Sequence, residues 1–401
     1  MKSTRKYKLI CLEATYLSAL QGCVGLCFII LLFPYFGHAH VDQDSSFFKK
    51  GVVKYNKGIY PSCLEDFNKA IAKEPNNFEA YYYRGLTQME LGHLDAAVED
   101  FNKTIELKPT YSMAFMKRGQ TRSAQKDKKG ATEDYSQALT LDPSNVEAYM
   151  MRGKDKLATQ DFNGAVRDFS GAIEKSPNLL MAYQLRGVAR LELKKYKDAI
   201  EDFSAVIKLN NKYTLAYYQR AVCKINIKDF EGALLDLNKA IQLDPKDKMA
   251  YFQRALCKRE FNYNKQAIDD YLKAIELDSK FMEAYYQLSI TKHNMGLIEE
   301  AIGHYSDLIK ILPYNSLAYL KRGMYYMEIK QYDAALADFN KVLNLNPNEK
   351  QAHYQRGLVK LKLNDKDGAC IDLKTAEKIG VKEATEYIKK NCKKDVHNFM
   401  K

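Results

Sequence analysis

A six-residue motif that ends in arginine and glycine returns along this chain at a fixed interval. It reads AYYYRG at 80–85, AYMMRG at 148–153, AYQLRG at 182–187, AYLKRG at 318–323 and AHYQRG at 352–357. The glycines at 85, 119, 153 and 187 are each 34 residues apart. A fixed period of this length predicts small structural units that stack on their neighbours, because one unit cannot bury its apolar face alone.

Ten units of 34 residues, without insertions, follow from cutting the sequence between residues 44 and 383. Position 8 of the unit is always small, as at Gly85, and so is position 20, as at Ala97. Position 24 is always large, as at Phe101, and position 4 is aromatic until the last unit, which has His353. Seven of the nine prolines share position 32: Pro75, Pro109, Pro143, Pro177, Pro245, Pro313 and Pro347.

These spacings predict two amphipathic helices in each unit. Positions 4, 8 and 11 share one helical face, and positions 20, 24 and 27 share another. Small residues at positions 8 and 20 allow two helix backbones to approach closely, while the large residues at positions 4 and 24 fill the remaining space. Proline at position 32 cannot continue the second helix and sets the turn into the next unit.

The pattern resembles the tetratricopeptide repeat (TPR) family over about 340 of the 401 residues. The small residue at position 8, alanine at 20, aromatic residue at 24 and proline at 32 carry the resemblance. It implies an all-α fold, a right-handed superhelical solenoid of antiparallel helix pairs. Two departures stand out, since tyrosine replaces the family's tryptophan at position 4 and arginine replaces its leucine at position 7.

Arginine at position 7 is one residue away from the buried seam, where a lone charge is unfavourable. Position 23, roughly opposite in an antiparallel pair, is aspartate wherever position 7 is arginine, as in Arg186 and Asp202. The first unit pairs Lys50 with Asp66, and the eighth loses both partners together. We therefore expect a salt bridge inside each unit; the alternative is a row of arginines that binds acidic ligands.

Both ends of the chain differ from the repeats. The tenth unit loses its proline, and residues 384–391 predict a capping helix, followed by a basic tail to residue 401. Residues 1–39 run from basic (Lys2, Arg5, Lys6, Lys8) through an apolar stretch at 23–36 to small residues. This order predicts a secretory signal peptide, with an uncleaved membrane anchor at 14–36 as the alternative. In either case we expect an extracytoplasmic protein, periplasmic, secreted or membrane-anchored.

Composition narrows the choice of partner and of chemistry. The formal net charge of +12 favours acidic partners, but acidic residues interrupt every basic run, so we expect no nucleic acid. Three of the eight cysteines lie in the N-terminal stretch; the other five, an odd number, argue against a disulfide framework and show no metal-ligand spacing. Cys223 and Cys257 hold position 10 and are expected to be buried. Without a nucleophile constellation or a phosphate-binding loop, we expect no enzyme, cofactor or metal.

The first helices of stacked pairs line the concave wall in this family. Position 5 of those helices is rich in aromatic and methionine side chains, which are typical anchors for partner recognition. We predict that it binds a peptide or partner segment through eight residues: Tyr82, Met116, Met150, Tyr218, Phe252, Tyr286, Leu320 and Tyr354. The alternative is that these side chains are buried between neighbouring first helices as ordinary packing.

The function predicted from these observations is a protein–protein interaction scaffold or adaptor in an extracytoplasmic envelope assembly. The competing hypothesis is a membrane-anchored architectural or self-associating spacer without a ligand in the groove. The oligomeric state stays open. Unit eight is irregular, with Ser289, Gly296 and Gly303 and without the arginine–aspartate pair, which indicates either a softer joint or neutral drift.

Overall fold

The computed structural model describes residues 46–392. The predicted signal or anchor at 1–39 and the basic tail after residue 392 lie outside the described residues. The chain divides into two compact parts after Pro75, and each is described by itself. The first contains α2 (Ser46–Asn56) and α3 (Tyr60–Lys73).

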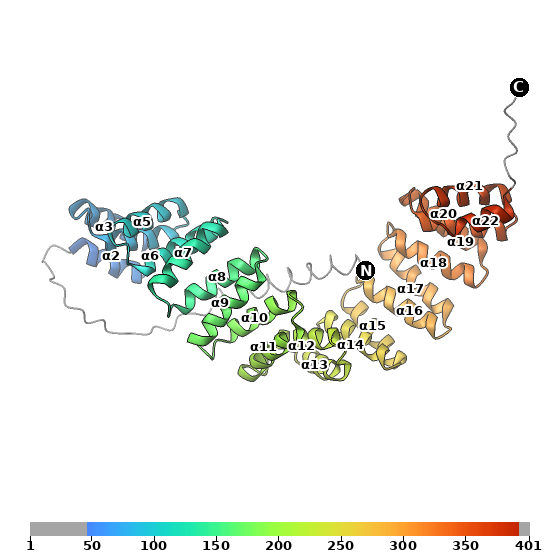
Figure 1. Ribbon diagram of the computed structural model, residues 1–401, viewed down its shortest axis with the longest axis horizontal. Coiled ribbons are helices and arrows are strands. Elements are labelled where there is room, and N and C mark those ends of the chain that lie inside the picture. Colours follow the sequence, from blue (N-terminus) through green and yellow to red (C-terminus); the bar gives the residue numbers. More distant parts are fainter. Residues whose placement is uncertain (1–45, 393–401) are drawn as a thin grey trace, which may run out of the picture. The chain divides into compact units, whose positions relative to one another are not determined.

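The second part continues the alternation of 13-residue first helices and mostly 14-residue second helices (Figure 1). The first helices are α4 (Phe78–Glu90), α6 (Ser112–Ala124), α8 (Val146–Ala158), α10 (Leu180–Glu192), α12 (Thr214–Asn226), α14 (Lys248–Glu260), α16 (Met282–Asn294), α18 (Ser316–Glu328) and α20 (Lys350–Lys362). The second helices are α5 (Leu94–Leu107), α7 (Lys128–Leu141), α9 (Phe162–Lys175), α11 (Tyr196–Leu209), α13 (Phe230–Leu243), α15 (Asn264–Leu277), α17 (Ile298–Ile311), α19 (Tyr332–Leu345) and α21 (Lys366–Lys378). The described residues contain no strand, which confirms the all-α solenoid of helix pairs.

The seam inside each pair is built as the spacing predicts. The position-24 ring is fully buried in most units and lies against the glycine at position 8. A Cβ atom added to Gly187 would lie 2.7 Å from Cε1 of Phe203, and the same atom at Gly85 would lie 2.8 Å from Phe101. Such a distance is shorter than normal contact, so a side chain at Gly187 would force the Phe203 ring to move. Units seven and eight have Ala255 and Ser289 at this position instead, each with a buried tyrosine at position 24.

The turn between the two helices of a unit depends on one residue at position 15 with a positive φ. It is Gly92 in the second unit, but Lys194 and Lys228 in later units adopt φ of 59° and 65°. In four units the next residue is an aspartate whose side chain caps the second helix. Asp161, for example, accepts a hydrogen bond from the Gly164 amide at 2.9 Å. Local turn chemistry therefore ends the first helix and starts the second.

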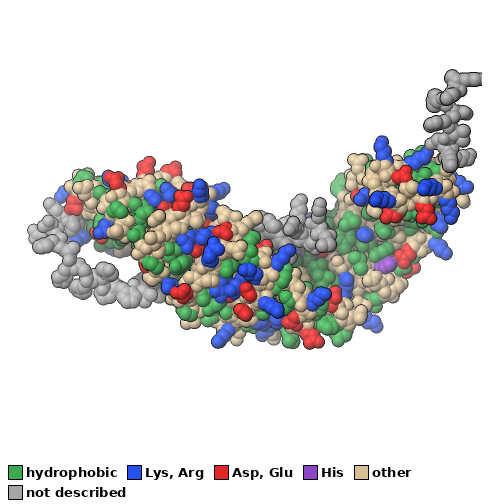
Figure 2. Space-filling view, viewed as in Figure 1, with side chains coloured by type: hydrophobic (Ala, Val, Ile, Leu, Met, Phe, Trp, Pro, Cys, Tyr) green, Lys and Arg blue, Asp and Glu red, His purple; other side chains and the backbone are tan. Residues whose placement is uncertain are grey.

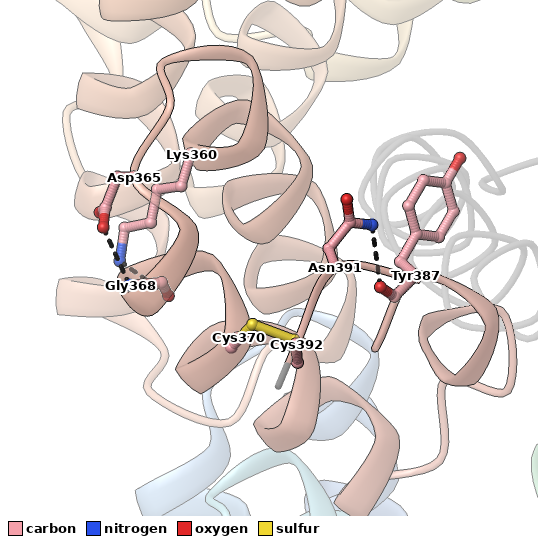
Figure 3. The surroundings of a disulfide bond; sticks show 7 residues. All are labelled: Lys360, Asp365, Gly368, Cys370, Tyr387, Asn391 and Cys392. Carbon is pink, nitrogen blue, oxygen red and sulfur yellow. Dashed lines mark hydrogen bonds between the residues drawn. A yellow bond between two sulfur atoms is a disulfide. The ribbon is translucent and has the colours of Figure 1, made fainter. Parts of the chain in front are cut away.

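The last pair is followed by α22 (Ala384–Asn391), which occupies the residues predicted to form a capping helix. A disulfide joins Cys370 on α21 to Cys392 at the end of α22 (Figure 3). The odd cysteine count, which argued against a disulfide framework, did not predict this single bond. The other described cysteines, Cys63, Cys223 and Cys257, are buried in the helix seams, as expected for the last two.

Between residues 46 and 392, no helix is both long and apolar enough to cross a bilayer.

Two glycine substitutions separate packing at position 8 from helix propensity. Gly187→Ala should lower the free energy of unfolding by about 1–3 kcal/mol, because its methyl group must displace the buried Phe203 ring. Gly303→Ala should raise it by about 0.5–1 kcal/mol, because Gly303 lies within α17 with no atom near its added Cβ. Urea titrations followed by circular dichroism measure both, and shifts in the same direction would contradict this account of the seam.

Candidate functional site

The predicted partner-binding residues at position 5 lie largely inside the solenoid. Met116 is fully buried, and four others are 6–8% exposed: Tyr82, Met150, Phe252 and Leu320. Three tyrosines of the set are half-buried: Tyr218, Tyr286 and Tyr354. The five buried side chains are packed between neighbouring helices, as the alternative hypothesis expects. Partner contact by the three tyrosines stays a prediction.

The contacts of Phe252 show why position 5 is occluded. Its ring lies 5.9 Å from the Tyr271 ring of the same unit and 5.0 Å from Phe281, which ends the turn before α16. Tyr82 meets Phe101 and Tyr111 in the same way, at 5.9 and 5.1 Å. Position 5 therefore closes the space between a unit's second helix and the following turn.

Between residues 76 and 392, the exposed large apolar side chains in and beside the first helix α18 lie at positions other than 5. Tyr314, in the turn before α18, is 83% exposed. Leu317 at position 2 and Met324 at position 9 are 45% and 37% exposed. Leu317 and Met324 are seven residues apart on one helix, so they share a face. The seven-residue spacing was readable in the sequence, but their exposure was not.

A row of glutamines occupies position 6 of the first helices, between positions 2 and 9. Gln219 accepts a hydrogen bond from Gln184 at 2.5 Å, and Gln287 accepts one from Arg259. The row comprises Gln219, Gln253, Gln287 and Gln355. We call the surface at positions 2, 6, 9 and 13 of the first helices the first-helix face.

The predicted salt bridge is present in every unit that has arginine at position 7 within residues 76–392. The guanidinium nitrogen approaches the aspartate oxygen to 2.5–2.7 Å. The aspartate side chains are only 1–5% exposed and the arginines 15–24%. Burial raises the pKa of Asp100, Asp202 and Asp338, so the arginine is needed to hold a charged carboxylate in this seam.

A second cation at position 11, which the sequence analysis missed, binds most of these aspartates. Arg190 lies 2.7 Å from Oδ2 of Asp202, while the nearest nitrogen of Arg186, Nη2, binds Oδ1. The full set is Lys54, Arg122, Lys156, Arg190, Lys224, Lys258 and Lys360, at 2.7–2.9 Å. In the first unit Lys54 therefore binds Asp66. The prediction of Lys50 was wrong, because that side chain is exposed and lies over the Phe47 ring.

Seven of the arginines at position 7 also contact the preceding unit. The Nη1 atom of Arg186 donates a hydrogen bond to Ser170 at 2.9 Å, while Nε and Nη2 donate to Asp202. Equivalent bonds of 2.6–2.9 Å join Arg118, Arg152, Arg220, Arg254, Arg322 and Arg356 to an asparagine or serine at position 25. The ring at position 4 lies beneath the guanidinium, as Tyr183 does beneath Arg186 at 5.6 Å. The arginine thus joins two units.

Unit eight lacks this arrangement at three positions together. Leu288 replaces the arginine, His304 replaces the aspartate, and Leu272 replaces the serine or asparagine of the preceding unit. Leu288 is fully buried in a cluster with Tyr271 and Phe281, so an apolar contact joins units seven and eight instead. Lys292, at position 11, turns to Glu300.

His304 is the polar group that this replacement leaves in the seam. Its Nε2 atom is buried without a hydrogen-bond partner. Burial lowers the pKa of the imidazole, and the nearby positive charge of Lys292 lowers it further.

The other histidine of unit eight, His293, lies at the junction with unit nine. Its ring stacks on the Tyr325 ring at 4.5 Å, and its Nε2 atom lies 2.7 Å from Glu328. These two histidines lie on different helices, as expected.

None of the described cysteine, histidine, aspartate or glutamate side chains form a group that could hold a metal ion. Cys257 is 1% exposed, and burial raises the pKa of its thiol to about 12. A thiol in that state is a poor nucleophile at neutral pH.

Removing one partner of the salt bridge should cost most where there is no second cation. Arg322→Leu leaves Asp338 buried with no cation at position 11, and should lower the free energy of unfolding by about 3 kcal/mol. Arg186→Leu should cost less, since Arg190 still binds Asp202. Urea titrations of both variants, completed to a double-mutant cycle with Asp338→Asn, measure the difference. A coupling energy near zero between Arg322 and Asp338 would contradict the assignment.

His304 should make unit eight sensitive to acid. Its folded pKa is below its ordinary value of 6.5, so the native state binds a proton more weakly than the unfolded state. Stability should therefore fall as the pH drops through the unfolded pKa, and protonation would place a charge beside Lys292. Glu300 and Asp307 oppose this effect. Urea midpoints between pH 8 and pH 5 test it, and a His304→Gln variant with an unchanged pH dependence would contradict it.

Comparison with known protein families places this architecture. Tetratricopeptide repeat models match residues 78–111, 114–145, 150–214, 215–247, 250–281 and 316–349. No curated protein was found to match the chain in sequence.

Several solved structures are similar to parts of this chain. The C-terminal part of a TPR repeat-containing protein from Cytophaga hutchinsonii is 21% identical, with a TM-score of 0.53, covering 59% of this chain and 97% of its own. A tetratricopeptide repeat protein from Parabacteroides merdae is 24% identical, with a TM-score of 0.44, covering 61% and 97%. YrrB, described as a TPR protein with an unusual peptide-binding site, is 22% identical, with a TM-score of 0.44, covering 47% and 98%.

These identities show the fold alone. The repeat models, in contrast, together cover more than half of the chain, in phase with the 34-residue period and with the helix pairs of the structure. The protein belongs to the tetratricopeptide repeat family.

Proposed function

We propose that this protein is an interaction scaffold whose first-helix face binds an extended segment of a partner protein. The observation that carries the proposal is the exposure of Tyr314, Leu317 and Met324 in and beside α18. Large apolar side chains that stay exposed on a shared face are typical of recognition sites, because their burial against a partner is favourable. Repeat proteins of this family act as scaffolds for other proteins, which agrees with such a role.

The composition of the face in unit nine indicates the kind of segment that fits. Leu317, Lys321, Met324 and Glu328 follow one another at the spacing of a single helical stripe. Leucine and methionine offer adaptable apolar contacts, and the lysine and glutamate between and beyond them add charge of both signs. A partner segment with apolar anchors and mixed charge matches this stripe.

The glutamine row adds groups that suit a peptide backbone. A carboxamide both donates and accepts hydrogen bonds, as a peptide group does. Gln253 lies at position 6 and is followed three residues later by a half-buried aliphatic side chain, Leu256. This alternation of amide and aliphatic residues would bind main chain and side chains of one extended segment together.

We further propose that the partner is a protein rather than nucleic acid, and that the scaffold has no catalytic role. On the face shown in Figure 2, Lys and Arg side chains are interspersed with Asp and Glu. A phosphate backbone is bound by a continuous basic surface, which this mixture does not offer.

The turn that carries Tyr314 is held by a neighbouring side chain. The half-buried Tyr286 donates a hydrogen bond from its hydroxyl group to Asn315 of this turn, at 3.0 Å.

An extracytoplasmic location is part of the proposal. The basic and apolar order of residues 1–39 supports it, and so does the Cys370–Cys392 disulfide, since such bonds persist in oxidising compartments. The mass of the mature protein purified from its native cells would distinguish cleavage near residue 39 from a retained anchor. A full-length protein with free Cys370 and Cys392 thiols would count against the location.

A peptide selection tests the binding face directly. Peptides would be selected from a random displayed library on residues 40–401, and their affinities measured by calorimetry. Combining Leu317→Ala with Met324→Ala should weaken the selected peptides at least about tenfold, because each lost anchor costs 1 kcal/mol or more. Circular dichroism would first confirm that the variant keeps its helices.

Leu235→Ala is the matched control, because Leu235 is 72% exposed but lies on the second helix α13. Its affinity should equal that of the wild type. Equal weakening by the control, or unchanged binding by the double variant, would contradict the proposed face. A selection that yields no binding peptide would favour the architectural spacer instead.

A further inference from the structure

The short helix α22 occupies the place of a first helix after the tenth unit. Ala384 follows Lys350, the first residue of α20, by 34 positions. The same interval separates Tyr387 from His353 and Ile388 from Tyr354, so α22 carries an aromatic residue at position 4 and an apolar residue at position 5. The helix therefore lies where the first helix of an eleventh unit would lie.

The surface beneath α22 is apolar. Leu373 and Ala376 of α21 are fully buried there, together with Val381 and Ala384. Partly buried side chains from α20 and α22 complete the cluster: Tyr354, Leu358, Leu361 and Ile388. Without α22, this end of the array would expose an apolar surface to water.

The helix α22 is short, and it packs on this cluster through Ile388 and through the Tyr387 ring, which lies 6.1 Å from the Tyr354 ring. It has eight residues, and an isolated helix of this length is unstable in water. Ala384 is its one buried residue, and Tyr387 is 38% exposed. A side-chain hydrogen bond of 2.6 Å joins Thr385 to Glu377 at its start. The turn that leads into it contains Gly380 at a φ of 99°.

The disulfide acts at the opposite end of the helix from this turn. Cys370 lies within α21, and Cys392 is the residue that ends α22, so the two connections hold α22 at both ends (Figure 3). Both cysteines are half-buried. By contrast, Cys63, Cys223 and Cys257 are 0–1% exposed. Among the cysteines that the structure describes, an external thiol therefore reaches this pair most easily.

We propose that the Cys370–Cys392 disulfide is a redox latch that keeps α22 on the end of the array. A dithiol reductant attacks one sulfur of the disulfide and forms a mixed disulfide, and one cysteine leaves as a thiolate. The second thiol of the reductant then displaces the other cysteine. Two electrons and two protons pass to the protein, which gains two thiols, and the reductant becomes a cyclic disulfide. The freed α22 leaves the array and uncovers Tyr354, Leu358 and Leu361.

Hydrogen exchange measured by mass spectrometry tests the latch on residues 40–401. Peptides that cover 384–391 should be protected in the oxidised protein and lose this protection in dithiothreitol. Cys392→Ser should show the same loss without reductant and no further change with it. Peptides from α18 and α19 serve as the internal control and should keep their protection in all samples.

Two results would overturn the proposal. Protection of 384–391 that survives reduction would show that packing alone holds α22. Loss of protection throughout α20 and α21 on reduction would show that the disulfide is a staple of the whole last unit and not a latch on its cap. Because the wild-type protein in dithiothreitol gives the same readout, the test does not depend on the folding of the Cys392→Ser variant.

Discussion

A guanidinium shared between two units is the interaction on which this solenoid depends. In seven units, the arginine at position 7 uses two of its nitrogens on the aspartate of its own unit and the third on the asparagine or serine before it. The planar fork of donors fixes the direction of both contacts. Packing of glycine against phenylalanine sets the distance within a pair, while this polar network sets the register between pairs.

Unit eight shows that the network is kept or lost as a whole. If Arg322 alone were absent, Asp338 would remain charged and buried, a state that costs several kcal/mol. Unit eight avoids this cost because Leu288, His304 and Leu272 replace all three members, and the leucine joins an apolar cluster. The joint between units seven and eight is therefore packed differently. His304 stays in the seam of unit eight with a buried Nε2 atom that has no hydrogen-bond partner.

The sequence predicted what the period determines and missed what depends on three-dimensional stacking. Helix pairs and the Arg186–Asp202 bridge followed from spacing, because equal positions in ten units must have equal surroundings. The burial of Met116 and Phe252 did not, since it depends on how closely the following turn approaches. Lys54, and not Lys50, binds Asp66, because it lies one helical turn further along α2 and its ammonium group reaches the carboxylate. The disulfide was missed because a cysteine count ignores that α22 folds back onto α21.

The same network leaves recognition to the variable positions of the repeat. Three of the five N–H groups of Arg186 already bind Asp202 and Ser170, and this internal use disfavours the row of arginines as a binding site. Position 5 is likewise used for packing in units such as those of Met116 and Phe252. The side chains that remain available are those at positions 2, 6, 9 and 13, which differ from unit to unit. Stability is thus specified by the constant positions, and affinity for a partner can change at the others without disturbing the fold.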